Sequence, residues 1–258
     1  MRITIMTLFK DMIENVLEYS MMGRARKNGL IEMDAVDIRD YANNKHNQVD
    51  DYPYGGGAGM LMMAQPVYDC YEAIKESMNG KKPRVLYMTP HGKRWNQQMA
   101  ENFAKEDNII IICGHYEGID QRVIEEIVTD EISIGDFVLT GGELPALMVA
   151  DSIMRLIPGV LGKQASFEDE SFSEGLLEYY HYTRPAVFHD RKVPDVLLSG
   201  NHKLINEHRR KESIINTYHK RPDLLETADL TEKEKQFLAD YIKNHCKEIV
   251  YMLLCKTV

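Results

Sequence analysis

Cysteine, tryptophan and long apolar runs are scarce in this chain. It has four cysteines and one tryptophan among 258 residues. Cys70, Cys113, Cys246 and Cys255 have neither the short spacing of metal ligands nor a paired framework, so we expect reduced thiols and no metal site. Charged residues follow the first eight positions at once, and no apolar stretch is long enough to span a bilayer. The sequence therefore predicts a cytoplasmic protein without a membrane partner.

Several familiar catalytic motifs are also missing. The chain has no G-x-x-x-x-G-K-[ST] phosphate loop, no H-E-x-x-H zinc motif and no G-x-S-x-G nucleophile turn. Its glycine tract at 55–59 fails the dinucleotide pattern, because Met60 and Met62 stand where the last glycine of that pattern would fall. These absences argue against nucleotide hydrolysis, dinucleotide-dependent redox chemistry, and serine or zinc hydrolysis.

The net charge of −9 is unevenly distributed. Residues 181–221 carry nine Lys or Arg against four Asp or Glu, a formal charge of +5, and five of the nine histidines. A basic face on an acidic protein is what selective contact with phosphates requires. A solvated helical surface with no partner would carry the same charges, so charge alone leaves both interpretations open.

Strand and helix patterns alternate through the first part of the chain. Strands are predicted at 2–8, 31–38, 84–89, 109–113 and 131–134, and helices at 11–28, 66–78, 96–105, 119–128 and 143–156. The continuous apolar run at 109–113 is typical of a strand buried on both faces of a parallel sheet. The predicted fold is therefore α/β with a mostly parallel sheet.

The pattern changes after Pro158 and Gly159. Residues 162–175 are acidic and polar with little apolar periodicity, which predicts a flexible linker. Helices are expected at 208–218 and 231–254, the second beginning with a Thr231/Glu234 capping box. We thus predict an α/β domain at 1–161, the linker at 162–175 and a smaller all-helical domain at 176–258.

Three glycine-bearing loops follow predicted strands, at 89–93, 114–120 and 134–145. The carboxyl ends of parallel strands share one edge of a sheet, where ligands usually bind. Gly141 and Gly142 allow a ligand to lie against bare backbone, and Glu143 and Pro145 suit the first turn of a helix whose amides point at it. A plain strand-to-helix turn would explain any one loop, but all three together predict a small-molecule site.

Seven motifs carry a resemblance to a known family. They are DYPYGGGAGM at 51–60, GHYEGID at 114–120, ISIGDFVLTGGELP at 132–145, IPGVLG at 157–162, GLL at 175–177, HYTRP at 181–185 and RPDLL at 221–225. In this order and separation, they make the chain resemble the bacterial tRNA (guanine-N1)-methyltransferases of the SPOUT superfamily over nearly its whole length. That resemblance implies a deep trefoil knot in the α/β domain and a tRNA-binding role for the helical one.

The resemblance also implies a cofactor and partners. S-adenosylmethionine would be bound by the knot loops, and tRNA would lie across a homodimer whose sites are at the dimer interface, with no DNA partner. The target would be the guanine 3′-adjacent to the anticodon, whose methylation supports reading-frame maintenance. Magnesium dependence is a further implication, although no metal cage is visible in the sequence. The residues expected to bind the methyl donor are Tyr87, Met88, Thr89, Pro90, Gly92, Gly114, Tyr116, Glu117, Gly118, Ser133, Ile134, Gly135, Asp136, Phe137, Val138, Leu139, Gly141, Gly142 and Pro145.

Guanine N1 carries a proton at neutral pH, so its methylation needs a base and a group that stabilises charge on O6. Arg155 matches the guanine-contacting arginine of the family. Relatives usually have an aspartate directly before Ser-Phe, where this chain has Glu170, with Asp169 one residue earlier. Alignment favours Glu170 and chemical identity favours Asp169, so both stay candidate bases. Gly59, Arg184, Arg209 and Ser213 are the expected substrate-binding residues.

Some positions depart from the family pattern. His91 and His115 stand where relatives often have Gln and Arg, Tyr180 replaces a common proline, and His208 replaces a frequent tryptophan. None removes a group that the chemistry needs. Two alternatives remain at this stage, a knotted methyltransferase with another RNA target and a non-enzymatic nucleic-acid-binding protein that uses the basic helices.

Overall fold

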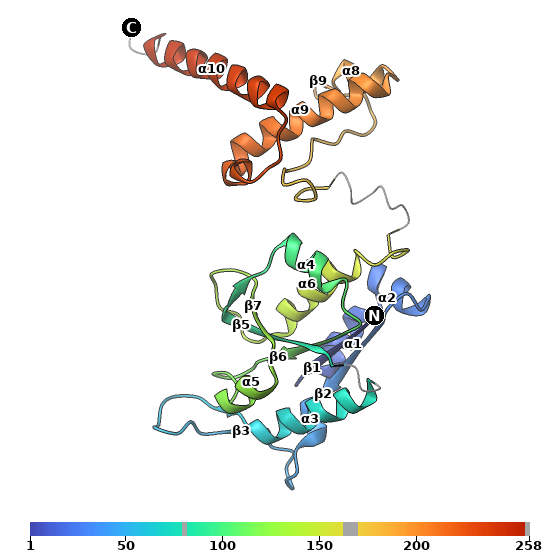
Figure 1. Cartoon of the computed structure of the whole chain (residues 1–258), viewed down its shortest axis with the longest axis vertical. Helices are drawn as coiled ribbons and strands as arrows, with labels where there is room; N and C mark the ends of the chain where they lie inside the picture. The colour runs from blue at the N-terminus through green and yellow to red at the C-terminus, as the bar shows by residue number, and fades with distance from the viewer. Residues whose placement is uncertain (79–81, 162–169, 256–258) are drawn as a thin grey trace. The chain divides into compact units, whose positions relative to one another are not determined.

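The computed structural model describes residues 1–78, 82–161 and 170–255 (Figure 1). The chain divides into two compact units, Met1–Gln164 and Ala165–Val258. Within the described residues, no helix combines the length and apolar character needed to cross a bilayer.

The first unit is built on a five-stranded sheet in the order β2-β1-β6-β5-β7. All neighbouring strands in it run parallel, which confirms the predicted α/β fold with a mostly parallel sheet. The strands span β1 (Arg2–Thr7), β2 (Glu32–Asp37), β5 (Arg84–Arg94), β6 (Asn108–Cys113) and β7 (Asp130–Ser133). A short antiparallel pair, β3 (Asp50–Asp51) and β4 (Leu61–Met62), brackets the glycine tract and was not predicted.

Apolar clusters on both faces of the sheet form the core of this unit. Side chains of β6 alternate between them, so that Ile109 and Ile111 join one cluster while Ile110 and Ile112 join the other. The first cluster packs under α1 (Lys10–Leu17), α2 (Ser20–Lys27), α4 (Gln97–Phe103) and α6 (Glu143–Met154). The second packs under α3 (Ala64–Ser77) and α5 (Gln121–Ile127), which lie on the opposite side of the sheet in Figure 1. The apolar run at 109–113 is thus buried on both faces, as predicted.

Two predicted elements of this unit have different bounds. The single helix expected at 11–28 is wrong, because the chain turns between α1 and α2, where Ser20 adopts a left-handed φ of 55°. The strand expected to end at residue 89 continues to Arg94. It pairs with β7 through Met88, loops away, and pairs with β7 again from Lys93. Apolar periodicity does not register either change, since both depend on local backbone geometry.

The described part of the second unit contains α8 (Asp195–Leu198), α9 (His202–Lys220) and α10 (Glu232–Cys255), with the 3-10 turn η2 (Pro222–Glu226) between the last two. The capping box is confirmed, since the Thr231 hydroxyl and backbone amide both donate to Glu234. The all-helical expectation is wrong at one place, where β8 (Val187–Phe188) and β9 (Arg191–Lys192) form an antiparallel hairpin. His189 and Asp190 form the turn of that hairpin with positive φ. Such a turn is not detected from helical periodicity.

Candidate active site

A cavity of about 370 Å³ lies at the carboxyl ends of β6 and β7 and beside the part of β5 that loops away from β7 between Met88 and Lys93. Residues of all three loops predicted at 89–93, 114–120 and 134–145 line it. The predicted residues that line it are Tyr87, Met88, Thr89, Pro90, Gly114, Tyr116, Glu117, Gly118, Ser133, Ile134, Gly135, Phe137, Val138, Leu139, Gly141, Gly142 and Pro145. The tertiary fold therefore gathers most of the predicted binding residues around one space.

The Gly142 turn lies directly against the end of β6. Its backbone amide donates to the Gly114 carbonyl at 2.9 Å. A Cβ at this position would lie 2.7 Å from the Cα of Cys113, closer than backbone atoms allow. Gly142 is also the N-cap of α6, so no side chain covers the amides of the first helical turn. The glycine thus joins two loops and leaves helix N–H groups next to the cavity.

The glycine tract is connected to the loop at 114–120. The amide of Glu117 donates to the Met60 carbonyl at 3.0 Å, and the amide of Met62 donates to the Gly118 carbonyl at 2.9 Å. Gly59 adopts a φ of 86°, and a Cβ there would lie 2.4 Å from Cγ of Glu117. The predicted substrate residue Gly59 therefore lies against a wall of the cavity, an approach that its lack of a side chain permits.

Glu143 and Thr7 form a buried polar pair beside the Gly141-Gly142 turn. Glu143 is 5% exposed, and its Oε1 accepts a hydrogen bond from the Thr7 hydroxyl at 2.8 Å. A Cβ on Gly141 would lie 2.4 Å from Oε2 of Glu143 and 3.0 Å from Nδ1 of His115, which has no hydrogen-bond partner. Burial, with Glu143 close by, raises the pKa of the Cys113 thiol well above its ordinary value. The sequence singled out Glu143 only as a helix-start residue, because its contact with Thr7 joins positions 136 residues apart.

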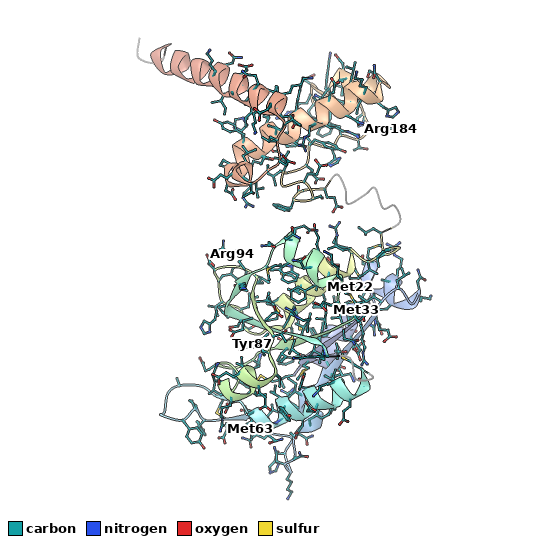
Figure 2. The ribbon with its side chains drawn as sticks, in the orientation of Figure 1. Met22, Met33, Met63, Tyr87, Arg94 and Arg184 are labelled. Atoms are coloured by element: carbon teal, nitrogen blue, oxygen red, sulfur yellow. The ribbon has the colours of Figure 1, made fainter. Side chains whose placement is uncertain are left out.

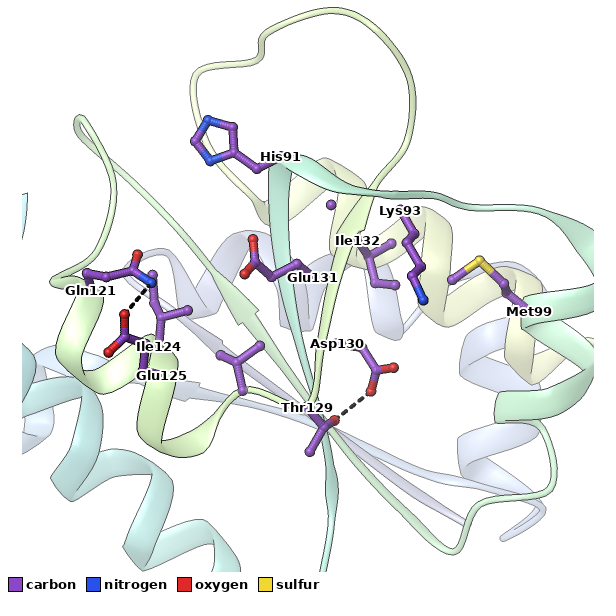
Figure 3. Close-up of a pocket in the computed structure, with 12 residues that line it drawn as sticks. His91, Lys93, Met99, Gln121, Ile124, Glu125, Thr129, Asp130, Glu131 and Ile132 are labelled. Atoms are coloured by element: carbon purple, nitrogen blue, oxygen red, sulfur yellow. Dashed lines mark hydrogen bonds between the residues drawn. The ribbon is translucent and has the colours of Figure 1, made fainter.

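A second cavity of about 380 Å³ adjoins the first, and His91, Glu131 and Ile132 line both (Figure 3). Tyr87 lines the first cavity and belongs to the second apolar cluster, and its burial, with the Glu131 carboxylate, raises its pKa. Gly92 lines this second cavity rather than the first. A Cβ on Gly92 would lie 2.3 Å from the backbone nitrogen of Ile132, so a glycine is required where β5 returns to β7.

The predicted and observed lining residues differ in both directions. Asp136, which was predicted to bind the donor, does not line the first cavity. Its exposed side chain pairs with Arg94 instead. Residues that line the cavity but were not predicted to bind are His91, His115, Ile119, Gln121, Ile124, Glu131, Ile132 and Thr140. Most lie within a few positions of a predicted loop, so adjacency to the strand ends was a usable signal for them.

The predicted chemical residues do not meet within the first unit. Arg155 is the C-cap of α6, whose 12 residues separate it from the Gly142 turn by about 18 Å along the helix. It is absent from the residues that line the cavity. Asp169 lies outside the described residues. Glu170 belongs to the second unit, where its carbonyl accepts hydrogen bonds from the amide and hydroxyl of Ser173.

The second unit gathers the remaining predicted residues along α9. Glu170, Arg209 and Ser213 line a cavity of about 270 Å³. Arg209 and Arg184 line another of about 420 Å³. In the part of the chain that the structure describes, no group of three His, Cys, Asp or Glu is placed to hold a metal ion.

Comparison with known proteins gives a consistent result. Residues 1–227 match the family described as tRNA (Guanine-1)-methyltransferase TrmD. A protein from Alkaliphilus oremlandii named tRNA (guanine-N(1)-)-methyltransferase is 56% identical over 92% of this chain and 97% of its own length. Proteins of the same name from Lachnospira eligens and Listeria monocytogenes are 57% and 54% identical, over 95% and 93% of this chain and 98% of each relative.

Proposed function

The chain belongs to the tRNA (guanine-1)-methyltransferase family, and from that premise we propose how its residues divide the reaction. The enzyme transfers a methyl group from S-adenosylmethionine to N1 of guanine in tRNA. The main observation behind this assignment of residues is the cavity that the three loops line. The target guanine is the one 3′-adjacent to the anticodon, and its methylation supports reading-frame maintenance.

The cavity in the first unit is the proposed binding site for S-adenosylmethionine. Its volume of about 370 Å³ is in the range usual for small-molecule sites, roughly 300–1,000 Å³. Gly114 and Gly142 leave their backbone uncovered beside the cavity, and Phe137 and Leu139 provide apolar surface. Adenine and ribose suit such a wall, because backbone amides and carbonyls recognise their edges while apolar side chains cover their faces. The donor supplies a methyl group already activated on a sulfonium sulfur.

The remaining chemistry concerns the proton on guanine N1. Glu170 or Asp169 accepts that proton, and the Arg155 guanidinium donates hydrogen bonds to O6, where negative charge grows as N1 is deprotonated. Placing N1 in line with the methyl group is an orientation effect. Either carboxylate suits the base, since the two residues are adjacent and differ by one methylene.

A homodimer explains how these groups could share one site. Arg155 is at the opposite end of α6 from the cavity, so a second subunit can bring its Arg155 to a cavity that this subunit's arginine does not line. An exposed apolar surface supports such a contact. Phe9, Met12 and Val16 repeat at helical spacing around α1, each at least 40% exposed, and Leu144 and Met148 do so on α6 at 53% and 57%. Burying such side chains would favour association.

The knot and the role of the second unit complete the proposal. In a trefoil knot, the loops after β5, β6 and β7 would pass through one another, and the excursion of β5 away from β7 and back supports this arrangement. The α/β domain at 1–161 would bind the donor, and 176–258 would bind tRNA through the basic stretch at 181–221. A magnesium requirement stays a prediction from the family resemblance, and within the described residues no group of three His, Cys, Asp or Glu is placed to hold the ion.

Transfer of labelled methyl tests this function. Two tRNA transcripts are compared, with guanine or adenine beside the anticodon, and the labelled nucleoside is identified. We expect N1-methylguanosine from the first transcript and no label in the second. Equal labelling of both transcripts, or of neither, would contradict the proposal.

A further inference from the structure

The cavity of about 420 Å³ in the second unit has an unusual lining for a surface that only contacts phosphates. The segment at 179–186 forms one side of it, with three tyrosines and Arg184. Helices α8 and α9 form the other side, where Leu197 and Ile205 provide an apolar floor. Among the described residues that line it, none is acidic. Flat aromatic walls, an apolar floor and cations suit a flat group attached to an anion.

The aromatic wall is held rigidly on α9. The Tyr180 amide donates to Glu212 at 3.1 Å, and its hydroxyl donates to the side chain of Asn216 at 3.0 Å. The ammonium of Lys220 lies 4.8 Å from the centre of the Tyr180 ring. These contacts fix the backbone of the segment before any ligand arrives, so the walls are preorganised.

The two arginines of this cavity differ from their neighbour Arg210. Arg210 is neutralised by Glu174 and Glu234. Within the described residues, neither Arg184 nor Arg209 pairs with a carboxylate, and Nε of Arg209 is buried without a hydrogen-bond partner. The Arg209 guanidinium lies 4.7 Å from the centre of the Tyr179 ring. Positive charge at this cavity is therefore available to a ligand, and one buried donor still needs an acceptor. Figure 2 shows Arg184 beside the helices of this unit.

We propose that this cavity, lined by Tyr179, Tyr182, Arg184, Leu197, Ile205 and Arg209, binds one unpaired nucleobase of the tRNA together with its phosphate. The base stacks on the tyrosines above the apolar floor, and the phosphate lies at the arginines. This inference rests on the proposed function for its RNA ligand. It goes beyond phosphate contact, because a double-stranded stem would present only its backbone to the same arginines.

The first test separates base binding from phosphate binding in the full-length protein. Leu197→Trp fills the cavity without changing any charge, and Leu204→Trp is the matched control, since Leu204 is an exposed α9 residue outside the cavity. We expect Leu197→Trp to weaken binding of an unmethylated tRNA transcript about 10-fold, with an unchanged salt dependence. Arg184→Gln should reduce the slope of log Kd against log salt concentration by about one, the contribution of one phosphate contact. Equal affinities for the two tryptophan variants would overturn the proposal.

A second measurement is independent of whether Leu197→Trp packs well. The wild-type protein with labelled Leu, Val and Ile methyl groups is titrated with guanosine, adenosine or uridine monophosphate, and separately with inorganic phosphate. Ring currents from a stacked base should shift the methyl signals of Leu197 and Ile205 with the nucleotides but not with phosphate. Identical spectra in the two titrations would refute base binding. Wild-type methyl transfer is measured alongside, so a failed methylation assay counts against the function and not against this cavity.

Discussion

The two units of this protein maintain their structures by different means. The first has a large apolar cluster on each face of its sheet, and its central strands β1 and β6 are almost fully buried. The second has a small apolar cluster of Leu176, Ile214 and Leu230. Polar contacts supplement it, such as the Thr217 hydroxyl that accepts from the Leu177 amide at 2.9 Å and the Asn216 amide that donates to the Glu178 carbonyl at 2.9 Å.

This difference matches the tasks proposed for the units. A site that aligns a methyl group with its acceptor tolerates little displacement, and close-packed backbone provides that rigidity. A surface that follows an RNA backbone can use exposed cationic side chains, whose contacts are individually weak and sensitive to salt. Substitutions in the first unit should therefore affect donor binding and the chemical step, whereas those in the second should affect tRNA affinity and local stability. Glu170 is the exception, because it lies in the second unit and is a candidate for the chemical step.

Replacing the proposed base tests that exception and should have the largest effect. Whichever of Glu170 and Asp169 accepts the N1 proton, its change to alanine should slow single-turnover methyl transfer by about 100- to 10,000-fold, the usual contribution of a general base. The other variant serves as the matched control and should react at close to the wild-type rate. The measurement uses saturating tRNA, so that weaker binding does not contribute. Near-wild-type rates from both variants would show that the general base is neither Glu170 nor Asp169.

Gly142→Ala should give the next largest effect. Its Cβ would lie 2.7 Å from the Cα of Cys113. Since a Cβ is fixed to its own backbone and the Cys113 Cα is a backbone atom, the turn must shift. We expect the affinity for S-adenosylmethionine, measured by calorimetry, to fall by about 100-fold, because displacements near 1 Å can be that costly. Gly141→Ala is the control. Its Cβ would meet the side chains of Glu143 and His115, which can move, so its loss should be smaller. Equal losses would show that backbone contact is not the cause.

Thr7→Val tests the buried polar pair under the cavity. The substitution keeps the shape of the side chain but removes the donor to Glu143 and the acceptor for the Phe9 amide. We expect a loss of about 1–3 kcal/mol in the free energy of unfolding. Thr4→Val is a matched control on the same strand, where Thr4 is fully buried but its partner Asp34 is 39% exposed. Water can replace the lost donor at Asp34, so Thr4→Val should lower the free energy of unfolding less than Thr7→Val does. Urea denaturation measures both, and a larger loss for Thr4→Val would contradict the assignment.

The smallest expected effect concerns acid stability of the second unit. Burial alone would raise the pKa of Glu234, but hydrogen bonds from Arg210 and Thr231 hold it below its ordinary value. A carboxylate with a lowered folded-state pKa stabilises the fold above its unfolded pKa of about 4.3, and that contribution is lost as the pH falls through the folded-state pKa. Arg210→Gln should therefore cost about 1 kcal/mol at pH 7 and less at pH 3.

Signals from the methyl groups of Leu230, followed during urea titration at the two pH values, measure this stability in the second unit. Lys235→Gln is the control. Its ion pair with Glu232 has side chains 57% and 89% exposed, so its loss should be close to zero at both pH values. An equal loss for Arg210→Gln at pH 7 and pH 3 would contradict the role of the Glu234 carboxylate.

Much of the first unit could be predicted from the sequence, because its signals are local. Apolar runs predicted the strands, and glycines after three of them predicted which loops would line a ligand site. The second unit was predicted less completely. Its helices followed from periodicity and capping, but the hairpin turned by His189 and Asp190 has no apolar repeat to reveal it.

The sequence by itself determined the family, the mostly parallel α/β sheet and the loops that form the cavity, because apolar runs and the glycines that follow them are local patterns. Only the tertiary structure decided which residues those loops bring together. It paired Asp136 with Arg94 and joined Glu143, beside the Gly141-Gly142 turn, to Thr7. Among the described residues, it also left Arg184 and Arg209 of one α9 cavity without a carboxylate partner. These outcomes depend on contacts between residues far apart in the chain, which sequence spacing cannot specify.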